Sequence, residues 1–199
     1  MKIGTLGAGE VALAFAAHLL KAGHEVLLSN SRGPSSLKEL VSKLGKGARA
    51  ATMDEAAIAP IVVLAVPWPS VEAVLSKLPD WKGRILIDAT NHFLLPSKKL
   101  ADLKGRVSSE IVSELAPSAK VVKALNTLYA SNLARNPKVG EGRRVIFVSG
   151  DDAGAKSKVS GLLKELGFAV IDLGSLGKGG RAQQVGNGLA GKDLVQFGD

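Results

Sequence analysis

The 199-residue chain predicts an α/β fold: a doubly wound, mostly parallel sheet of about eight strands in a single domain. Two observations lead to this prediction. Short apolar segments alternate with helical patterns along the sequence, and only 4% of the residues are aromatic. Ala, Val, Leu and Gly dominate instead, as expected for parallel strands that helices cover on both faces. A length of 199 residues favours one domain over two.

The elements follow one another in a regular order. Strands are expected at residues 2–6, 24–30, 48–51, 61–66, 84–88, 120–125, 143–149 and 169–173. Helices are expected from Gly9 to Gly23, over residues 36–44, 71–78 and 153–166, and from Ser108 or Ser109 to Leu115, with short helices after Thr52 and before residue 134. Thr52 and Glu55 form a capping-box pattern. Residues 92–106 read as a long polar connection, and the glycine-rich residues 174–199 as loops with one short helix.

A glycine turn directly follows the first strand. Gly7-Ala8-Gly9 ends the apolar segment, and Glu10 and Val11 begin a helical pattern. The glycines permit a tight turn and a close approach to a pyrophosphate, and a helix N-terminus favours that anion. Ala12 takes the third small position of the G-x-G-x-x-G/A pattern. Strand, turn and helix together indicate a Rossmann-type dinucleotide site that includes Gly7, Ala8, Gly9, Glu10 and Val11.

The end of the second strand indicates which dinucleotide binds. A fold that prefers NAD commonly places Asp or Glu there, to bind the ribose 2′-hydroxyl. This chain has Asn30, Ser31 and Arg32, so no carboxylate would repel a 2′-phosphate. Arginine binds phosphate well through its planar fork of donors. We therefore predict NADP(H) as the cofactor; the alternative is that Ser31 to Pro34 forms only a polar turn.

Three loops at strand ends carry the residues expected around a second reactant. Ligands of open parallel sheets lie beyond the carboxyl ends of the strands. Val66-Pro67-Trp68 would form a flat apolar wall, and Asn126 and Thr127 would form hydrogen bonds to a carboxamide or ring edge. Asn91, after the fifth strand, completes the expected cofactor-binding set. Ordinary loop packing of Trp68 and a turn or cap role for Asn91 remain alternatives.

Acid–base groups are scarce near these loops. His18 and His24 are expected to be structural, and His92 is a lone loop histidine, which is weak support for catalysis. Asp88 ends a buried strand and is expected to cap the following turn. The spacing of His, Asp and Glu predicts no metal site. Lys123 lies inside a strand pattern. Hydride transfer between two redox rings needs positioning and little else, so no catalytic side chain is predicted.

Charge and composition limit the partners. The formal net charge is +8, but the basic residues are dispersed and no aromatic platform accompanies them, so nucleic acid is not an expected partner. No apolar segment approaches the length of a membrane span, and none resembles a secretory leader. The chain has no cysteine, which fits a cytoplasmic protein. Anionic small molecules are the expected ligands.

Several segments together resemble a known family, the NADPH-dependent reductases of the deazaflavin coenzyme F-420. The similar segments are residues 2–12, 29–32, 66–68, 109–112, 120–128, 150–152 and 173–176, including the specific pieces V-P-W and K-V-V-K-A-L-N-T-L. The resemblance implies hydride transfer between NADPH and a deazaflavin, whose rings would stack near Pro67-Trp68 and Asn126-Thr127. It also implies that Ser31 and Arg32 bind the 2′-phosphate, and that the protein is a homodimer.

Residues 1–199 are accordingly expected to form one NADP(H)-binding domain, with residues 143–199 as a C-terminal extension of the sheet. Residues 88–92 and 179–184 fit bacterial relatives for which a flavin, a quinone or a small carbonyl could replace coenzyme F-420. The alternatives are a non-catalytic NADP(H)-binding redox sensor or interaction module, and an NADPH-dependent reductase of a small carbonyl or imine. Hydroxyacid dehydrogenases and pyrroline-carboxylate reductases are disfavoured, because no helical block is expected after the last strand.

Overall fold

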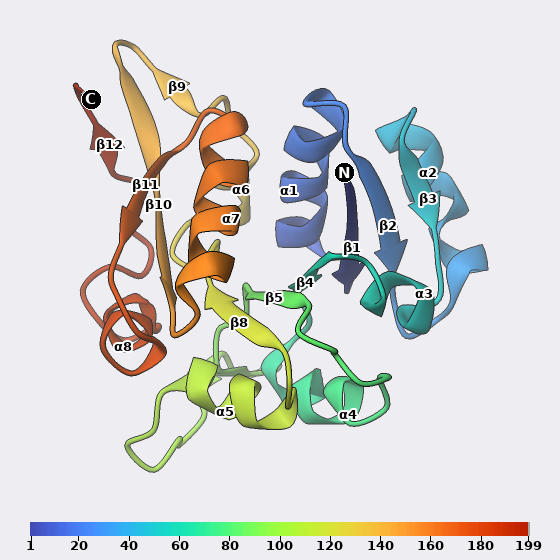
Figure 1. Ribbon diagram of the computed structural model, residues 1–199, viewed down its shortest axis with the longest axis horizontal. Coiled ribbons are helices and arrows are strands. Elements are labelled where there is room, and N and C mark those ends of the chain that lie inside the picture. Colours follow the sequence, from blue (N-terminus) through green and yellow to red (C-terminus); the bar gives the residue numbers. More distant parts are fainter. Residues whose placement is uncertain (199) are drawn as a thin grey trace.

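A central sheet carries helices on both faces in the computed structural model, which describes residues 1–198 (Figure 1). Along the sheet the strands are β11 (Ala169–Asp172), β10 (Gly142–Gly150), β8 (Lys120–Lys123), β5 (Ile85–Asp88), β4 (Ile61–Leu64), β1 (Lys2–Leu6), β2 (Glu25–Ser29) and β3 (Ala48–Ala50). The six strands from β8 to β3 are parallel, whereas β10 is antiparallel to β8. Two short strands, β9 (Lys138–Val139) and β12 (Val195–Gln196), also pair with β10. The predicted fold class is confirmed.

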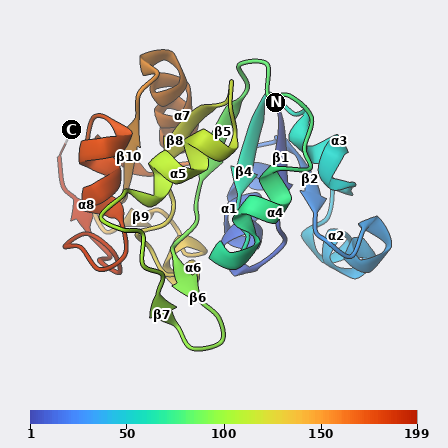
Figure 2. The same ribbon diagram turned by 90° about the horizontal axis from the view of Figure 1, so that it is seen from below.

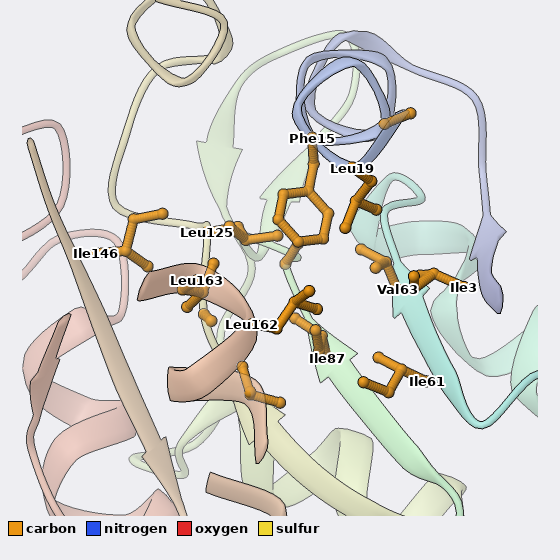
Figure 3. Close-up of a cluster of buried hydrophobic side chains, with 14 of the residues drawn as sticks. Ile3, Phe15, Leu19, Ile61, Val63, Ile87, Leu125, Ile146, Leu162 and Leu163 are labelled. Atoms are coloured by element: carbon orange, nitrogen blue, oxygen red, sulfur yellow. The ribbon is translucent and has the colours of Figure 1, made fainter. Parts of the chain in front are cut away.

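Two hydrophobic layers hold the helices against the sheet. Helices α1 (Glu10–Lys21), α2 (Lys38–Leu44), α6 (Ala130–Leu133) and α7 (Ala153–Glu165) pack on one face, and α3 (Met53–Ala57), α4 (Val71–Leu75) and α5 (Ser108–Leu115) on the other. Figure 3 shows the first layer, where Phe15 of α1 and Leu162 of α7 meet over Ile87. Removing a fully buried side chain such as Phe15 would cost about 3–5 kcal/mol.

Local interactions set the start of α3 and its close contact with β1. The predicted capping box is present: Thr52 Oγ1 accepts from Glu55 N at 3.2 Å, and Glu55 Oε2 accepts from Thr52 N at 2.7 Å. The hydrogen bond from the Thr52 backbone, with that from its hydroxyl, lowers the pKa of the Glu55 carboxyl. Gly4 allows α3 to lie against β1, since a Cβ atom there would stand 2.0 Å from the Ala56 carbonyl oxygen.

Four segments differ from the sequence expectation. Strands β4 and β8 end at Leu64 and Lys123, two residues before the predicted ends. The expected polar connection contains a small hairpin, β6 (Phe93–Leu94) and β7 (Lys99–Leu100), which is drawn at the lower edge of Figure 2. The glycine-rich end forms a π-helical segment, Leu176–Gly180, and then α8 (Arg181–Gln183) before β12. These elements are too short to produce a recognisable period in the sequence.

Candidate functional site

A pocket lies at the carboxyl ends of β1, β2 and β4. Its volume is about 300 Å³, and it brings together Gly7–Gly9, Asn30–Arg32 and Val66–Pro67, all predicted from the sequence to bind a cofactor. The other lining residues are Met53, Ala65, Ser70 and Val74. Among the lining residues that the structure describes, Arg32 is the one charged side chain. We call this cavity the nucleotide pocket.

The two glycines of the turn have different surroundings. Gly7 has a φ of 105°, and a Cβ atom there would lie 2.3 Å from the Ala65 carbonyl oxygen. Gly9 has extended backbone, with φ −81° and ψ −179°, and a Cβ there would meet no atom of residues 1–198 within 4 Å. The fold therefore requires glycine at position 7, whereas the space at Gly9 is open to a ligand.

That open space adjoins the N-terminus of α1. Gly9 is the N-cap residue, and no side chain of the described residues caps the helix there. The first N–H groups of the helix have no intrahelical acceptors, and the helix dipole adds partial positive charge. Glu10 is exposed and Val11 is half-buried; neither lines the nucleotide pocket. The helix end can thus bind an anion through its backbone.

The turn after β2 presents two free side chains. Asn30 holds the turn together: its Oδ1 accepts from Arg32 N at 2.9 Å, and its Nδ2 donates to Ser36 Oγ at 3.0 Å. Ser31 and Arg32 are exposed, and within residues 1–198 their side chains form no hydrogen bond or ion pair. A hydroxyl and a guanidinium are therefore available on the rim of the nucleotide pocket.

Four lining residues were not among those predicted from the sequence, and one of them, Ala65, directly follows β4. Met53 begins α3, and Ser70 and Val74 belong to the turn and helix after Pro67. The capping box at Thr52 could have pointed to Met53, because it predicts that a helix begins at Met53, directly after a strand of the sheet. Trp68 does not line the nucleotide pocket; its ring packs edge-on against His92, with centroids 6.3 Å apart.

A second group of polar residues lies at the ends of β5 and β8. Asn91 Nδ2 donates to the Asn126 main-chain oxygen at 2.9 Å, and Asn126 Nδ2 donates to Asn91 Oδ1 at 3.1 Å. Asn126 also donates to the Gln183 main-chain oxygen at 2.8 Å. We call Asn91, Asn126 and Gln183 the amide cluster. Thr127 is buried beside it, and its carbonyl accepts from Gly191 N.

The backbone turns sharply just before Asn126. Leu125 has a φ of 68°, in the left-handed region that residues with a Cβ rarely adopt. Its side chain is buried in the first hydrophobic layer, which offsets a backbone cost of about 1–2 kcal/mol. Strand β8 therefore ends at Lys123, and Asn126 faces Asn91 and Gln183.

A fully buried ion pair lies beneath the amide cluster. Lys123 Nζ donates to Asp88 Oδ2 at 3.0 Å and to the Thr90 carbonyl at 2.6 Å, and both side chains are inaccessible to solvent. Asp88 Oδ1 also accepts from Thr90 N at 2.9 Å, which is the turn-capping role expected from the sequence. Because the Lys123 ammonium is buried and paired with the Asp88 carboxylate, Lys123 is not available to a substrate.

His92 lies close to this pair. Its ring is buried, and its Nδ1 has no hydrogen-bond partner within the described part of the chain. Burial and, secondarily, the charge of Lys123 lower the pKa of His92. The imidazole is therefore neutral at pH 7. The other two histidines serve the fold, since His18 bonds the Leu133 carbonyl and His24 contacts the chain's amino group.

The glycine-rich segment near the C-terminus completes this edge of the sheet. Gln183 is fully buried: its Nε2 donates to the Phe147 carbonyl at 2.9 Å, and its Oε1 accepts from Ser149 Oγ at 2.6 Å. Gln184 Oε1 accepts from Ser108 N, at the start of α5. No sequence pattern indicated these contacts, because they join residues far apart in the chain.

Residues 1–198 contain no group of three His, Asp or Glu side chains that could hold a metal ion. No helix within the same range has the length and apolar character needed to cross a membrane. The nucleotide pocket offers groups that can bind an anion, and the amide cluster offers hydrogen bonds.

Comparisons with known proteins bear on the family and the fold. The family model described as NADP oxidoreductase, coenzyme F420-dependent, matches residues 2–92. A hypothetical protein from Sinorhizobium meliloti shares 42% identity, covers 98% of this chain and 96% of its own, and superposes with a TM-score of 0.93. A proposed F420-dependent NADP reductase from Arthrobacter sp. FB24 has 28% identity, with coverage of 98% and 100% and a TM-score of 0.77.

A longer curated relative also matches. The metalloreductase STEAP3 of Rattus norvegicus is 31% identical over 176 residues, which is 88% of this chain and 34% of that protein. The chain therefore spans about a third of the length of the metalloreductases that it matches.

Proposed function

The chain belongs to the family of NADP oxidoreductases that depend on coenzyme F-420, and we propose that it transfers a hydride between NADPH and a deazaflavin or flavin-like acceptor. Bound NADPH would supply a hydride to a ring carbon of the acceptor and become NADP⁺, and solvent would supply the proton that completes the reduced ring. The single observation that carries the proposal is the nucleotide pocket, where the open helix end at Gly9 adjoins Arg32.

The nucleotide pocket supports NADPH as the dinucleotide. Backbone N–H groups after Gly9 would bind the pyrophosphate, and the free space at Gly9 is what a close phosphate requires. Ser31 and Arg32 would bind the 2′-phosphate, since their side chains are exposed on the rim. Met53 and Val74 add apolar surface for the adenine.

The nicotinamide half would extend toward β4, β5 and β8. In this strand order a dinucleotide lies across the sheet, with its second half over the strands that follow the switch point. Neighbouring strands are ~4.8 Å apart, so the Asn126 loop lies roughly 14 Å from the glycine turn, three strands away. Val66-Pro67-Trp68, Asn91, Asn126 and Thr127 would then border the ring.

These residues would act by position. The wall at Pro67 and the half-buried Trp68 would exclude water from one side of the rings. Asn91 and Asn126 would orient the ring by hydrogen bonds, and hydride transfer then depends on distance and alignment. The buried Asp88–Lys123 pair and neutral His92 fit a site in which no side chain has to accept a proton.

A panel of acceptors tests the proposal. Purified protein is given NADPH with coenzyme F-420, with FMN or riboflavin, with a soluble quinone and with a small imine, and absorbance at 340 nm is followed. Rapid oxidation with the deazaflavin or the flavin is expected. Binding of NADPH without oxidation by any acceptor would favour the redox-sensor alternative, and oxidation by the imine alone would favour the imine reductase alternative.

Three further properties belong to the proposal. Residues 1–199 would act as one NADP(H)-binding unit, in which residues 143–199 extend the sheet. The protein would be a cytoplasmic homodimer. Light scattering coupled to size exclusion measures the mass in solution, and a monomer of 20.6 kDa would contradict the dimer.

A further inference from the structure

We propose that Gln183 is a positioning residue for the redox site: it holds Asn126 so that the Asn126 Oδ1 atom accepts a hydrogen bond from the nicotinamide carboxamide N–H. This inference rests on the proposed binding of NADP(H). It makes the segment Leu176–Gln184 part of the site, although the segment lines no part of the nucleotide pocket.

The hydrogen-bond network fixes which atom of the Asn126 amide is left without a partner. The Asn126 main-chain oxygen can only accept, so the Asn91 atom that contacts it must be Nδ2. The other Asn91 atom is then Oδ1, which needs a donor, and Asn126 Nδ2 supplies it. The Gln183 main-chain oxygen is likewise only an acceptor, and it takes the second proton of Asn126 Nδ2. Both protons of this amide are thereby used.

The remaining atom of that amide is left without a partner. Asn126 is 4% exposed, and its Oδ1 has no hydrogen-bond partner among residues 1–198. A buried carbonyl oxygen without a donor is costly, because it has lost its bonds to water. The oxygen belongs to a loop at the carboxyl edge of the sheet, beyond β8, where the nicotinamide half is expected. The donor that this oxygen requires is a ligand N–H, and the carboxamide of nicotinamide carries one.

Gln183 reaches Asn126 because its own side chain is anchored. Strands β8 and β10 pair only through Ser149–Lys123 and Gly150–Val122. Beyond that point, Gln183 bonds Ser149 Oγ and the Phe147 carbonyl. The Gln183 side chain thus binds β10 at the point where the hydrogen bonds between β8 and β10 end. This anchor fixes the position of the Gln183 main-chain oxygen relative to Asn126. Loss of the anchor would free one proton of Asn126 and allow its amide to rotate.

Cofactor analogues measure this contact without any acceptor. The 3-acetylpyridine analogue of NADP⁺ has a methyl group in place of the carboxamide NH₂ and cannot donate. We expect wild-type protein to bind NADP⁺ about tenfold more tightly than the analogue by calorimetry, since one hydrogen bond is lost. In Asn126→Ala the two affinities should become equal. In Gln183→Met the preference should fall to about threefold or less.

A neighbouring residue provides the matched control. Gln184→Met removes a similar tail hydrogen bond, but one that caps α5 rather than positions Asn126, so the tenfold preference should persist. If Gln183→Met does not fold, Ser149→Ala removes only the bond to Gln183 Oε1 and should still reduce the preference. Adenosine 2′,5′-bisphosphate reports the nucleotide pocket alone and should bind all four variants equally.

The outcomes distinguish failure of the proposed function from failure of the role proposed for Gln183. Failure of wild-type protein to bind both the bisphosphate and NADP⁺ would overturn the proposed function, and this inference with it. Normal binding of both, combined with no wild-type preference over the acetyl analogue, would overturn the inference alone. A full preference retained in Gln183→Met, or lost in Gln184→Met, would also overturn it.

Discussion

The two halves of the carboxyl edge are built in opposite ways. At β1, β2 and β4 the functional groups are exposed and unengaged: Gly9 has open space, and Arg32 extends from a turn held only by Asn30 and Ser36. At β5, β8 and β10 the polar groups are buried and bonded to one another, as in the Asp88–Lys123 pair and the amide cluster.

This difference matches the demands on each half. An anion with many oxygens can be bound by adaptable donors, and long-range charge helps even when the geometry is loose. Hydride transfer depends on tenths of an ångström, so the ring needs contacts that are rigid before it arrives. Substitution of the open groups of the first half, Gly9 and Arg32, should therefore change binding and spare stability, whereas substitution of the buried Asp88–Lys123 pair in the second half should lower stability.

The largest effect is expected at the buried ion pair. Lys123→Met leaves the Asp88 carboxylate buried without its counter-charge, and should lower the free energy of unfolding by about 3–5 kcal/mol. Urea unfolding measures the loss. The double variant Asp88→Leu with Lys123→Met removes both charges and should recover much of it. A single-variant loss below about 1 kcal/mol would show that the pair is not a rigid support.

The two glycines should separate binding from folding. Gly9→Val fills the open space and should weaken NADPH binding at least about 100-fold. The free energy of unfolding should change by no more than about 1 kcal/mol. Gly7→Val meets the Ala65 carbonyl and a strained backbone, and should cost about 3 kcal/mol or more of stability. Unchanged NADPH affinity in folded Gly9→Val would refute the phosphate site.

Arg32 should decide between the two dinucleotides. Arg32→Ala removes a charge-assisted bond to the 2′-phosphate and should weaken NADPH binding by about 1.5–3 kcal/mol. NADH lacks that phosphate, so its affinity should hardly change. Fluorescence titration with both dinucleotides measures the two affinities. An equal loss of affinity for both would contradict the assignment of specificity to this turn.

His92 should give the smallest effect. Its pKa is lowered in the folded state by burial and then by Lys123, so below pH ~6.5 the unfolded chain takes up a proton that the folded chain refuses. Stability should therefore fall as the pH drops from 7 to 5, and His92→Gln should show a shallower fall in a urea series. The same variant should keep its hydride-transfer rate within about threefold; a loss of several orders of magnitude would reveal a missed proton-transfer step.

The sequence predicted one half of this edge better than the other. Gly7–Gly9 and Asn30–Arg32 are contiguous in the chain, so a local pattern of strand, turn and helix was sufficient to bring them together. Eight of the ten strands of the sheet followed from the same alternation of elements. The capping box at Thr52 was readable for the same reason, because its two hydrogen bonds join residues three positions apart.

The other half depends on contacts between distant residues. Lys123 looked like any residue of a strand pattern, and only the pairing of β5 with β8 sets it opposite Asp88. Gln183 lies in a glycine-rich segment without periodicity, and its partners Phe147 and Ser149 are more than 30 positions away. A single sequence carries no local signal for such contacts.

The sequence separation of Asn126 and Gln183 also sets the order in which the two parts of the site can form during synthesis. Every residue that lines the nucleotide pocket lies between positions 7 and 74, whereas Asn126 finds its partner 57 residues later in the chain. As the chain leaves the ribosome N-terminus first, the segments of the phosphate-binding side emerge well before Gln183 does. A ribosome-bound chain halted before Gln183 would carry the glycine turn and Arg32 but no anchor for Asn126.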